Sequence, residues 1–160
     1  MWEKLSLLLL LIAANGAPIL LAWALGPRWN WPLDGGQMYP DGHRLLGGHT
    51  TLRGLVIAVS ATMILAGLLG LGAGLGALIG LLAMVGDALS SFVKRRLGLK
   101  PGDKATGLDQ IPESLLPLVV VAGHYGLGWL DLALMVATFT LLDMAVSGPL
   151  YRLRLRRRPY

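Results

Sequence analysis

Long apolar runs separated by short polar stretches constrain this chain more than any other feature. Five such runs cover about residues 5–25, 55–71, 75–93, 111–125 and 129–150. A helix of about 20 apolar residues can cross the hydrocarbon core of a bilayer. Charged residues make up only 14% of the sequence, against roughly 25% in a soluble domain, which excludes an ordinary soluble protein. We therefore expect an all-α integral membrane protein, a bundle of five transmembrane helices with two polar cytoplasmic loops.

The few charges predict how this bundle is oriented. With five spans, the segments after the first and third runs and the C-terminal tail lie on one side of the membrane. That side holds 13 of the 14 Lys and Arg residues and leaves only Lys4 opposite. By the positive-inside rule it faces the cytoplasm. We expect residues 1–151 to form one domain in the cytoplasmic membrane, with the N-terminus outside, and residues 152–160 to form a basic cytoplasmic tail.

Acidic residues gather on the same side as the basic ones. A purely structural membrane protein needs bases there but has little use for acids, so the excess predicts a polar chemical site. The sequence has no cysteine, which excludes disulfides, thiolate metal sites and cysteine nucleophiles. Six of the nine acids lie in or at the edge of the polar segments: Asp34, Asp41, Asp87, Asp103, Asp109 and Glu113.

The strongest motif ends the third apolar run. A carboxylate at Asp87 is costly so close to hydrocarbon, so we expect it to face a polar cavity or a cation. Ser90, Ser91 and Lys94 follow three, four and seven residues later and share one face of a helix with Asp87. Such a stripe suits the joint binding of a metal and a phosphate. The simpler alternative is a structural contact of Asp87 with Ser91 or Lys94.

A second carboxylate follows after a short polar segment. Residues 102–110 carry glycines that turn the chain back toward the membrane, and Asp109 lies at the start of the fourth run. Asp87 and Asp109 bracket one loop, so they can approach each other. Mg²⁺ bound by one or two carboxylates together with substrate phosphates fits this inventory. The alternative is that Asp109 only caps a helix.

The segment 41–54 combines glycines with Arg and Thr side chains that can donate to phosphate, although it lacks the Walker pattern. Its alternative is a solvated loop. Asn15 and Pro18 predict a kink with an amide inside the bundle. Asp131 and Asp143 are interpreted as structural, with Asp143 the better functional candidate.

Together these motifs resemble the CDP-archaeol synthases, a compact five-span family related to the phosphatidate cytidylyltransferases. The resemblance runs from about residue 15 to 120. It rests on the motifs in this order: Asn15-x-x-Pro18, Asp41-Gly-x-Arg44-x-x-Gly47, Arg53-Gly54, Gly86-Asp87-x-x-Ser90-x-x-x-Lys94-Arg95-Arg96 and Leu108-Asp109-Gln110.

The resemblance implies a CTP-dependent enzyme of phospholipid biosynthesis. It would transfer CMP from CTP to a membrane lipid phosphate and form a CDP-lipid and pyrophosphate, with Mg²⁺ as cofactor. Asp87 and Asp109 would bind the metal and act in catalysis with Lys94. The family usually carries a lysine where this chain has Thr50, so Arg53 or His49 is expected to replace it. The residues expected to bind CTP or phosphate are Asp41, Arg44, Thr51, Arg53, Ser90, Lys94, Arg95 and Arg96.

Two other classes of protein stay open at this point. A small transporter would use Asp87 and Asp143 as ion or proton sites. A non-enzymatic scaffold would bind anionic lipid through its basic tail. Neither explains why acids and bases gather in two loops. We expect no nucleic-acid partner, and Gly76-x-x-x-Gly80 permits close helix packing within the chain or in a homo-oligomer.

Overall fold

The computed structural model describes residues 2–100, 103, 105 and 107–152. Within these residues it has five helices, which confirms the number and order of the expected helices. Residues 153–160 of the expected basic tail lie outside the described part of the chain. The helices are α1 (Trp2–Leu25), α2 (Leu52–Leu68), α3 (Ala73–Arg96), α4 (Gln110–Tyr125) and α5 (Trp129–Arg152).

Three of the helices in the described ranges are long and apolar enough to cross a membrane. They are α1, α3 and residues Trp129–Pro149 of α5. The apolar helix α2 has 17 residues, and α4 has 16 residues with Pro117 inside it. The all-α membrane class is therefore confirmed, while two of the five expected spans are shorter than a typical transmembrane helix.

The largest boundary error concerns α2, which begins and ends three residues before the predicted run. The hydroxyl of Thr51 accepts a hydrogen bond from the Gly54 amide at 3.2 Å, so it caps the helix and starts it at Leu52. The chain leaves the helix after Leu68. Gly70 and Gly72 then adopt positive φ angles of 74° and 89°, which helical residues do not use.

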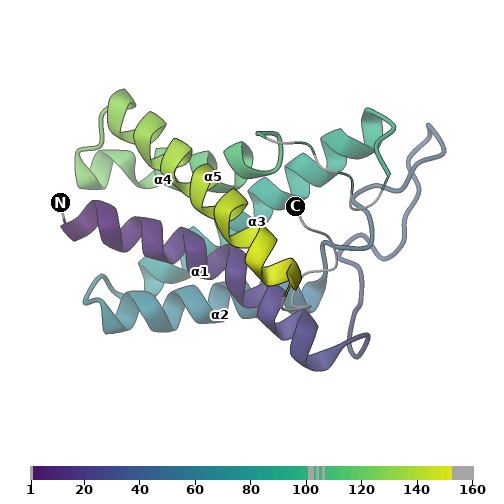
Figure 1. Ribbon diagram of the computed structural model, residues 1–160, viewed down its shortest axis with the longest axis horizontal. Helices are drawn as coiled ribbons and strands as arrows, with labels where there is room; N and C mark the ends of the chain where they lie inside the picture. Colours follow the sequence, from purple (N-terminus) through teal and green to yellow (C-terminus); the bar gives the residue numbers. More distant parts are fainter. Residues whose placement is uncertain (1, 101–102, 104, 106, 153–160) are drawn as a thin grey trace.

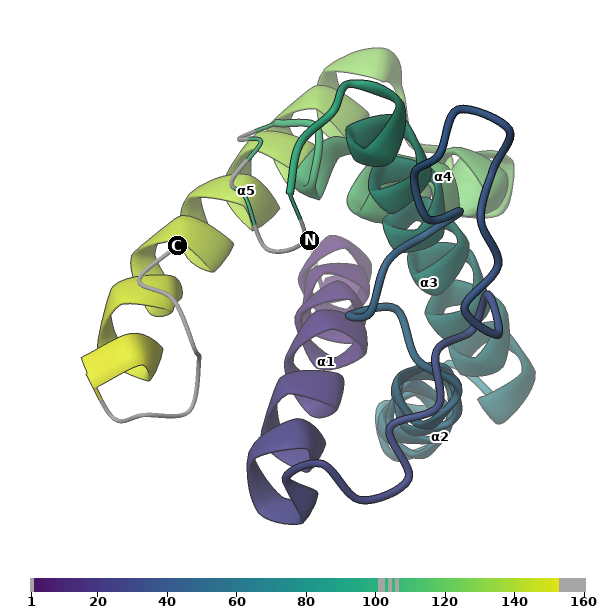
Figure 2. The ribbon, with the colours of Figure 1, turned by 90° about the vertical axis from the view of Figure 1, so that its right-hand side faces the viewer.

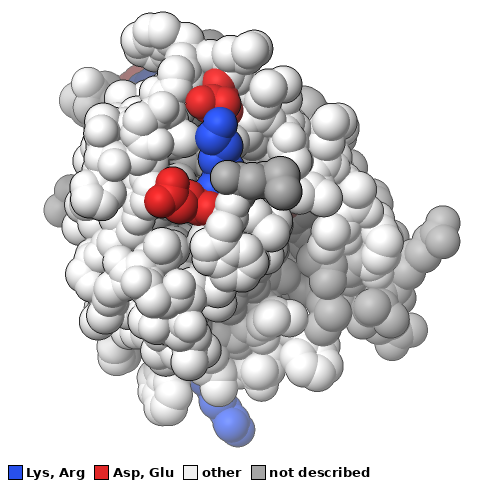
Figure 3. Space-filling model, turned by 90° about the vertical axis from the view of Figure 1, so that its left-hand side faces the viewer, with Lys and Arg blue, Asp and Glu red and all other residues white. Residues whose placement is uncertain are grey.

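The helices form a bundle in which each one packs against its neighbour in the chain, and α1 also contacts α3, α4 and α5. The N-terminus and the turns that join α2 to α3 and α4 to α5 lie at one end (Figure 1). The segments that join α1 to α2 and α3 to α4 lie at the other end. The surface at the N-terminal end is largely uncharged (Figure 3), and Lys4 Nζ there lies 2.6 Å from Asp131 Oδ1.

The apolar core holds the N-terminal end together and leaves polar residues to the other end. α1 contributes a buried stripe to this core, and the other helices pack their side chains against it. Many apolar side chains instead face outward, including Ile64 at 65% and Leu68 at 80% exposure, as expected for surfaces in contact with lipid. The main members of the core are Leu7, Leu10, Leu11, Ala66, Ile79, Leu118, Val121, Leu132, Met135 and Phe139.

Glycines let α3 approach both of its neighbours closely. A Cβ atom on Gly76 would lie 2.2 Å from the Thr62 carbonyl oxygen of α2, and one on Gly80 would lie 2.3 Å from Thr62 Oγ1. The Gly76-x-x-x-Gly80 motif is thus used within the chain. A Cβ on Gly86 would lie 2.3 Å from the Pro112 carbonyl oxygen of α4. Gly86 therefore allows the residue that follows it, Asp87, to lie next to the start of α4.

Candidate active site

The two long connecting segments lie together at one end of the bundle (Figure 2). Polar side chains from three parts of the chain are in contact there. The C-terminal half of α3 contributes Asp87, Ser91 and Lys94. Asp109 immediately precedes α4. Thr50 comes from the end of the segment that joins α1 to α2, two residues before α2 begins. The segments 26–51 and 97–109 bring these residues together.

Asp87 is half-buried and bonded to a hydroxyl from a distant part of the sequence. Thr50 Oγ1 donates to Asp87 Oδ2 at 3.1 Å and lies 3.2 Å from Ser91 Oγ. Because a hydroxyl has a single proton, Ser91 donates to Thr50 while Thr50 donates to Asp87. The charges of Lys94 and Asp109 also act on Asp87. The side chain of Asp87 thus accepts a hydrogen bond from Thr50, rather than from the Lys94 or Ser91 of the simpler sequence interpretation.

Asp109 forms an ion pair with Lys94 and does not cap α4. Lys94 Nζ lies 2.5 Å from Asp109 Oδ1, and the Ala105 amide donates to Asp109 Oδ2 at 3.3 Å. Although Asp109 occupies the residue before α4, its side chain makes no capping hydrogen bond to the helix. The capping alternative therefore does not describe what this carboxylate contacts.

Two of the expected phosphate ligands on α3 bond to backbone carbonyls. The hydroxyl of Ser90, which is 1% exposed, donates to the Asp87 carbonyl oxygen at 2.9 Å. Arg95 donates from Nη1 to the Leu99 carbonyl at 2.5 Å and from Nη2 to the Lys100 carbonyl at 3.2 Å. The expected stripe of Asp87, Ser90, Ser91 and Lys94 therefore divides, because the Ser90 hydroxyl bonds to the backbone. Arg95, which lies outside that stripe, also bonds to the backbone.

Arg96 holds the first connecting segment (residues 26–51, between α1 and α2) against α3. Its Nε lies 3.1 Å from Asp41 Oδ2, and its Nη2 donates to the Arg44 carbonyl oxygen at 2.8 Å. The guanidinium also stacks over two rings, at 4.3 Å from the centre of Tyr39 and 5.0 Å from that of Phe92. Asp41 and Arg96 thus belong to one contact between the segment and the helix.

Asp34, which the sequence interpretation left without a role, organises the same segment. Its side chain is fully buried and pairs with Arg44 Nη2 at 2.8 Å. Its carboxylate also accepts from the amides of Gly36 at 2.9 Å, Leu46 at 3.0 Å and Gly47 at 3.2 Å. Burial raises the pKa of Asp34, but these hydrogen bonds outweigh it and hold the pKa below its usual value. The signal in the sequence is Asp34-Gly35-Gly36, an aspartate before glycines that is typical of a turn.

Thr51 and Arg53 also have structural contacts. Thr51 caps α2, and Arg53 Nη1 donates to the carbonyl oxygens of Gly26, at 2.8 Å, and of Arg28. These contacts tie the start of α2 to the end of α1. The segment 26–51 therefore has defined internal contacts, while most of its residues are exposed to solvent.

A second polar group lies between α1, α4 and α5. Asn15 Nδ2 donates to Asp143 Oδ1 at 3.3 Å, and Gln110 Nε2 donates to Asp143 Oδ2 at 3.0 Å. The structure thus explains the amide expected inside the bundle at Asn15. Asp143 thus contacts Gln110, the residue that directly follows Asp109.

The donor set at Asp87 and Asp109 fits Mg²⁺. Two carboxylates and the hydroxyls of Thr50 and Ser91 are all hard oxygen ligands, which Mg²⁺ prefers to nitrogen or sulfur. Among the described residues, no group of three or more His, Cys, Asp or Glu side chains is arranged to hold a metal ion. A magnesium ion here would therefore take its remaining oxygen ligands from water or from a bound phosphate.

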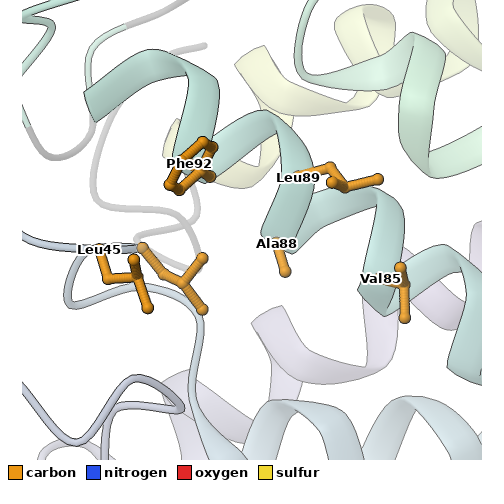
Figure 4. Close-up of a pocket in the computed structure, with 6 residues that line it drawn as sticks. Leu45, Val85, Ala88, Leu89 and Phe92 are labelled. Carbon is orange, nitrogen blue, oxygen red and sulfur yellow. The ribbon is translucent and has the colours of Figure 1, made fainter. Parts of the chain in front are cut away.

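An apolar groove lies between α3 and the segment that joins α1 to α2 (Figure 4). It has a volume of about 290 Å³ and opens to the surface of the molecule. The first connecting segment supplies two leucines on one side and α3 supplies the other side. Phe92 both lines the groove and lies under the Arg96 guanidinium, so one end of the groove meets a cation. Its lining residues are Leu45, Leu46, Val85, Ala88, Leu89 and Phe92.

Comparison with known proteins identifies the family. The CarS-like family, described as CDP-archaeol synthase, matches residues 71–160. A CDP-archaeol synthase of Methanopyrus kandleri is 38% identical over 143 residues, which cover 81% of this chain and 79% of the relative. The chain belongs to the CDP-archaeol synthase family. The resemblance drawn from the motifs is confirmed.

Other CDP-archaeol synthases match along nearly the whole chain. The one from Hyperthermus butylicus is 33% identical and covers 99% of this chain and 95% of its own length. The one from Aeropyrum pernix is 34% identical, with coverages of 99% and 91%. A solved structure described as an intramembrane enzyme for archaeal membrane lipids biosynthesis superposes with a TM-score of 0.74 and 33% identity, covering 90% of this chain and 92% of that one. Membership of the CDP-archaeol synthase family favours an enzyme over a transporter or a scaffold.

Proposed function

We propose that this protein transfers CMP from CTP to an archaeal lipid phosphate, forming a CDP-lipid and pyrophosphate, with the site at Asp87 and Asp109 as its catalytic centre. The family supports the activity. The observation that carries the location is the ion pair of Asp109 with Lys94, because it holds the Asp109 carboxylate against the face of α3 that also carries Asp87. Both substrates are polyanions, so their approach requires cations at the site.

Mg²⁺ is the proposed cofactor, held by Asp87 and Asp109. When bound, the ion would neutralise phosphate charge and help to align the triphosphate. Lys94 would move from Asp109 to a phosphate oxygen as the metal and CTP bind. CTP would compete for the present backbone and carboxylate partners of the residues proposed to line the nucleotide pocket. These residues are Asp41, Arg44, Thr51, Arg53, Ser90, Arg95 and Arg96.

The reaction requires little proton transfer. An oxygen of the lipid phosphate, already ionised, attacks the α-phosphorus of CTP, and the bond from that phosphorus to the leaving pyrophosphate breaks. The chain's contribution is to position the two phosphates and to stabilise the developing negative charge. Lys94 suits this task because its side chain is 13% exposed and its amine lies next to the carboxylate that the metal would share.

The proposed membrane arrangement is the five-span topology with residues 1–151 as one domain, the site on the cytoplasmic side and the C-terminus inside. The two long connecting segments meet at one end of the bundle. They hold eight of the 23 charged residues, and the helix ends that adjoin them hold six more, which supports this orientation. The apolar groove beside α3 would accept part of the hydrocarbon chain of the lipid, with the phosphate at the end near Arg96. A reporter protein fused after residue 160 tests this orientation. Its detection outside the cell would contradict it.

The activity is tested by incubating the purified protein in lipid nanodiscs with labelled CTP, Mg²⁺ and a panel of ether-linked and ester-linked lipid phosphates. We expect a labelled CDP-lipid from the ether-linked archaeal substrates. No labelled lipid from any member of the panel would contradict the proposed function.

The location of the site is tested by Asp87→Asn and Asp109→Asn. Each variant keeps the size of the side chain but removes a negative charge that the metal needs, so we expect activity to fall by at least about 100-fold. Asp131→Asn is the matched control, since it makes the same change at the opposite end of the bundle. Full activity in either test variant would exclude that carboxylate from metal binding.

A further inference from the structure

Asn15, Gln110 and Asp143 form a polar junction between α1, α4 and α5. It takes no direct part in the proposed chemistry, although burying it costs free energy. A carboxylate inside an apolar helix is costly unless it is paired or hydrogen-bonded. The two amides of Asn15 and Gln110 donate to separate oxygens of Asp143 and offset that cost. Both amides use their N–H groups, so the junction requires an acceptor at position 143.

Gln110 is held at both ends of its amide. Its nitrogen donates to Asp143 at 3.0 Å, and its oxygen accepts from the Gly107 amide at 3.0 Å. The side chain is buried, with 7% of the residue exposed. Gly107 has a φ of 87° and its carbonyl accepts from Ile111, so it forms the turn that leads into α4. One amide thus links this turn to α5.

Asp109 lies in the turn that the side-chain amide of Gln110 holds, between Gly107 and Gln110 in the sequence. It directly precedes Gln110, and its own amide donates to the Ala105 carbonyl at 3.0 Å. On the side of α3, Lys94 Nζ lies 2.5 Å from the Asp109 Oδ1 atom. If Gln110 were released from Asp143, the turn before α4 would lose its attachment to α5. The carboxylate of Asp109 would then be set only by Lys94 and the Ala105 amide.

We propose that Asp143 is a positioning residue that acts through Gln110 to hold Asp109 in place for the divalent cation. This inference rests on the proposed function, because Asp109 needs fixing only if it binds the metal. It predicts that Asp143 affects metal affinity without touching the metal, CTP or the lipid phosphate.

Asp143→Asn breaks the junction with little change in size. The new amide at position 143 has an oxygen in place of only one of the two carboxylate oxygens, so its NH₂ group faces the NH₂ group of either Asn15 or Gln110. We expect Mn²⁺, added alone and followed by electron paramagnetic resonance, to bind about 10- to 100-fold more weakly than in the wild type, the usual effect of losing an outer-shell partner. The Mg²⁺ concentration for half-maximal activity should rise in parallel, while kcat at saturating Mg²⁺ changes only a few-fold.

Combining this change with Gln110→Glu should restore metal binding. The new carboxylate at position 110 can accept from the Gly107 amide and from the new amide at position 143, whose oxygen still accepts from Asn15. The hydrogen bonds from Gly107 to position 110, between positions 110 and 143, and from Asn15 to position 143 are then all present. Only the bond between positions 110 and 143 has its donor and acceptor exchanged. Asp131→Asn is the control, since it makes the same substitution at the other end of α5.

The results separate this inference from the proposed function. Weak Mn²⁺ binding in Asp143→Asn and its recovery in the double variant would support the positioning role. Wild-type Mn²⁺ binding in Asp143→Asn would overturn it, as would a double variant that unfolds at the wild-type temperature but binds Mn²⁺ as weakly as the single one. The titration needs no turnover, so failure of the wild type to form a CDP-lipid would count against the proposed function alone.

Discussion

Lys94 Nζ lies 2.5 Å from Asp109 Oδ1, and this ion pair joins the last turns of α3 to the residue that precedes α4. Both side chains are partly shielded from solvent, at 13% and 28% exposure. A shielded ion pair is worth more than one on an open surface. Lys94 therefore occupies the oxygen that a divalent cation would use in the proposed function, so the lysine and the metal compete for it.

Replacing Lys94 by Met should separate metal binding from catalysis. Without the competing ammonium group, Mn²⁺ in the absence of CTP should bind on the order of tenfold more tightly, which corresponds to about 1.4 kcal/mol. Turnover should nevertheless fall by about 100-fold or more, because the cation that stabilises phosphate charge is gone. Lys100→Met, which removes an exposed lysine from the segment that follows α3, is the control. Weaker metal binding in Lys94→Met would contradict the competition.

Thr50 should matter through its hydroxyl alone. Thr50→Val keeps the shape of a residue that is 1% exposed but removes the proton donated to Asp87. A hydrogen bond to a charged group contributes about 1.5–3 kcal/mol, so we expect kcat/KM to fall about 10- to 100-fold. Thr50→Ser retains the donor and should keep most of the activity. Equal losses in both variants would indicate that the methyl group, and not the hydroxyl, is what the site requires.

The helices could be predicted from sequence because the signal is local. Apolar runs bounded by glycines locate five helices, and most boundaries fall within three residues of the observed ones. The boundaries of α2 were missed because Thr51, which was assigned to phosphate binding, caps the helix. The predicted run 111–125 agrees with α4 to within one residue, so the short length of this helix is also predicted from the sequence.

The candidate site could be predicted only in part. Intramembrane acids are rare, so Asp87 and Asp109 stood out from their residue type and surroundings. The contact between Thr50 and Asp87 joins residues 37 positions apart and leaves no local pattern. Asp34 was missed for a related reason, since three of its four partners lie 10–13 residues away in a segment with no regular structure.

Gly86 should be intolerant of even one added methyl group. In Gly86→Ala the new Cβ would lie 2.3 Å from the Pro112 carbonyl oxygen, which is backbone and cannot rotate away. Separating α3 from α4 should cost roughly 1–3 kcal/mol and lower the thermal unfolding temperature in detergent. Gly74→Ala, also in α3 but with nothing within 4 Å of the new Cβ, should leave stability equal or slightly higher. An unchanged unfolding temperature in Gly86→Ala would show that the two helices can move apart freely.

Asp34 should make the stability of the first connecting segment depend on acid pH. Its pKa in the folded protein lies below the unfolded value of 3.8, so the ionised form is the one that the fold binds. The stabilisation is therefore complete well above pH 3.8 and is lost as the pH falls through the lower, folded pKa. Asp34→Asn should cost about 3 kcal/mol at pH 7, since it removes one member of a buried ion pair.

That difference should shrink as acid protonates the wild-type carboxylate. Thermal unfolding of the wild type and Asp34→Asn, followed in detergent from pH 7 to pH 3, should give curves that converge below pH 3.8. Glu3→Gln, an exposed acid at the opposite end of the bundle, should run parallel to the wild type throughout. A gap between wild type and Asp34→Asn that stays constant down to pH 3 would show that the charge of Asp34 does not hold the segment. The loss would then come from the changed shape of the side chain.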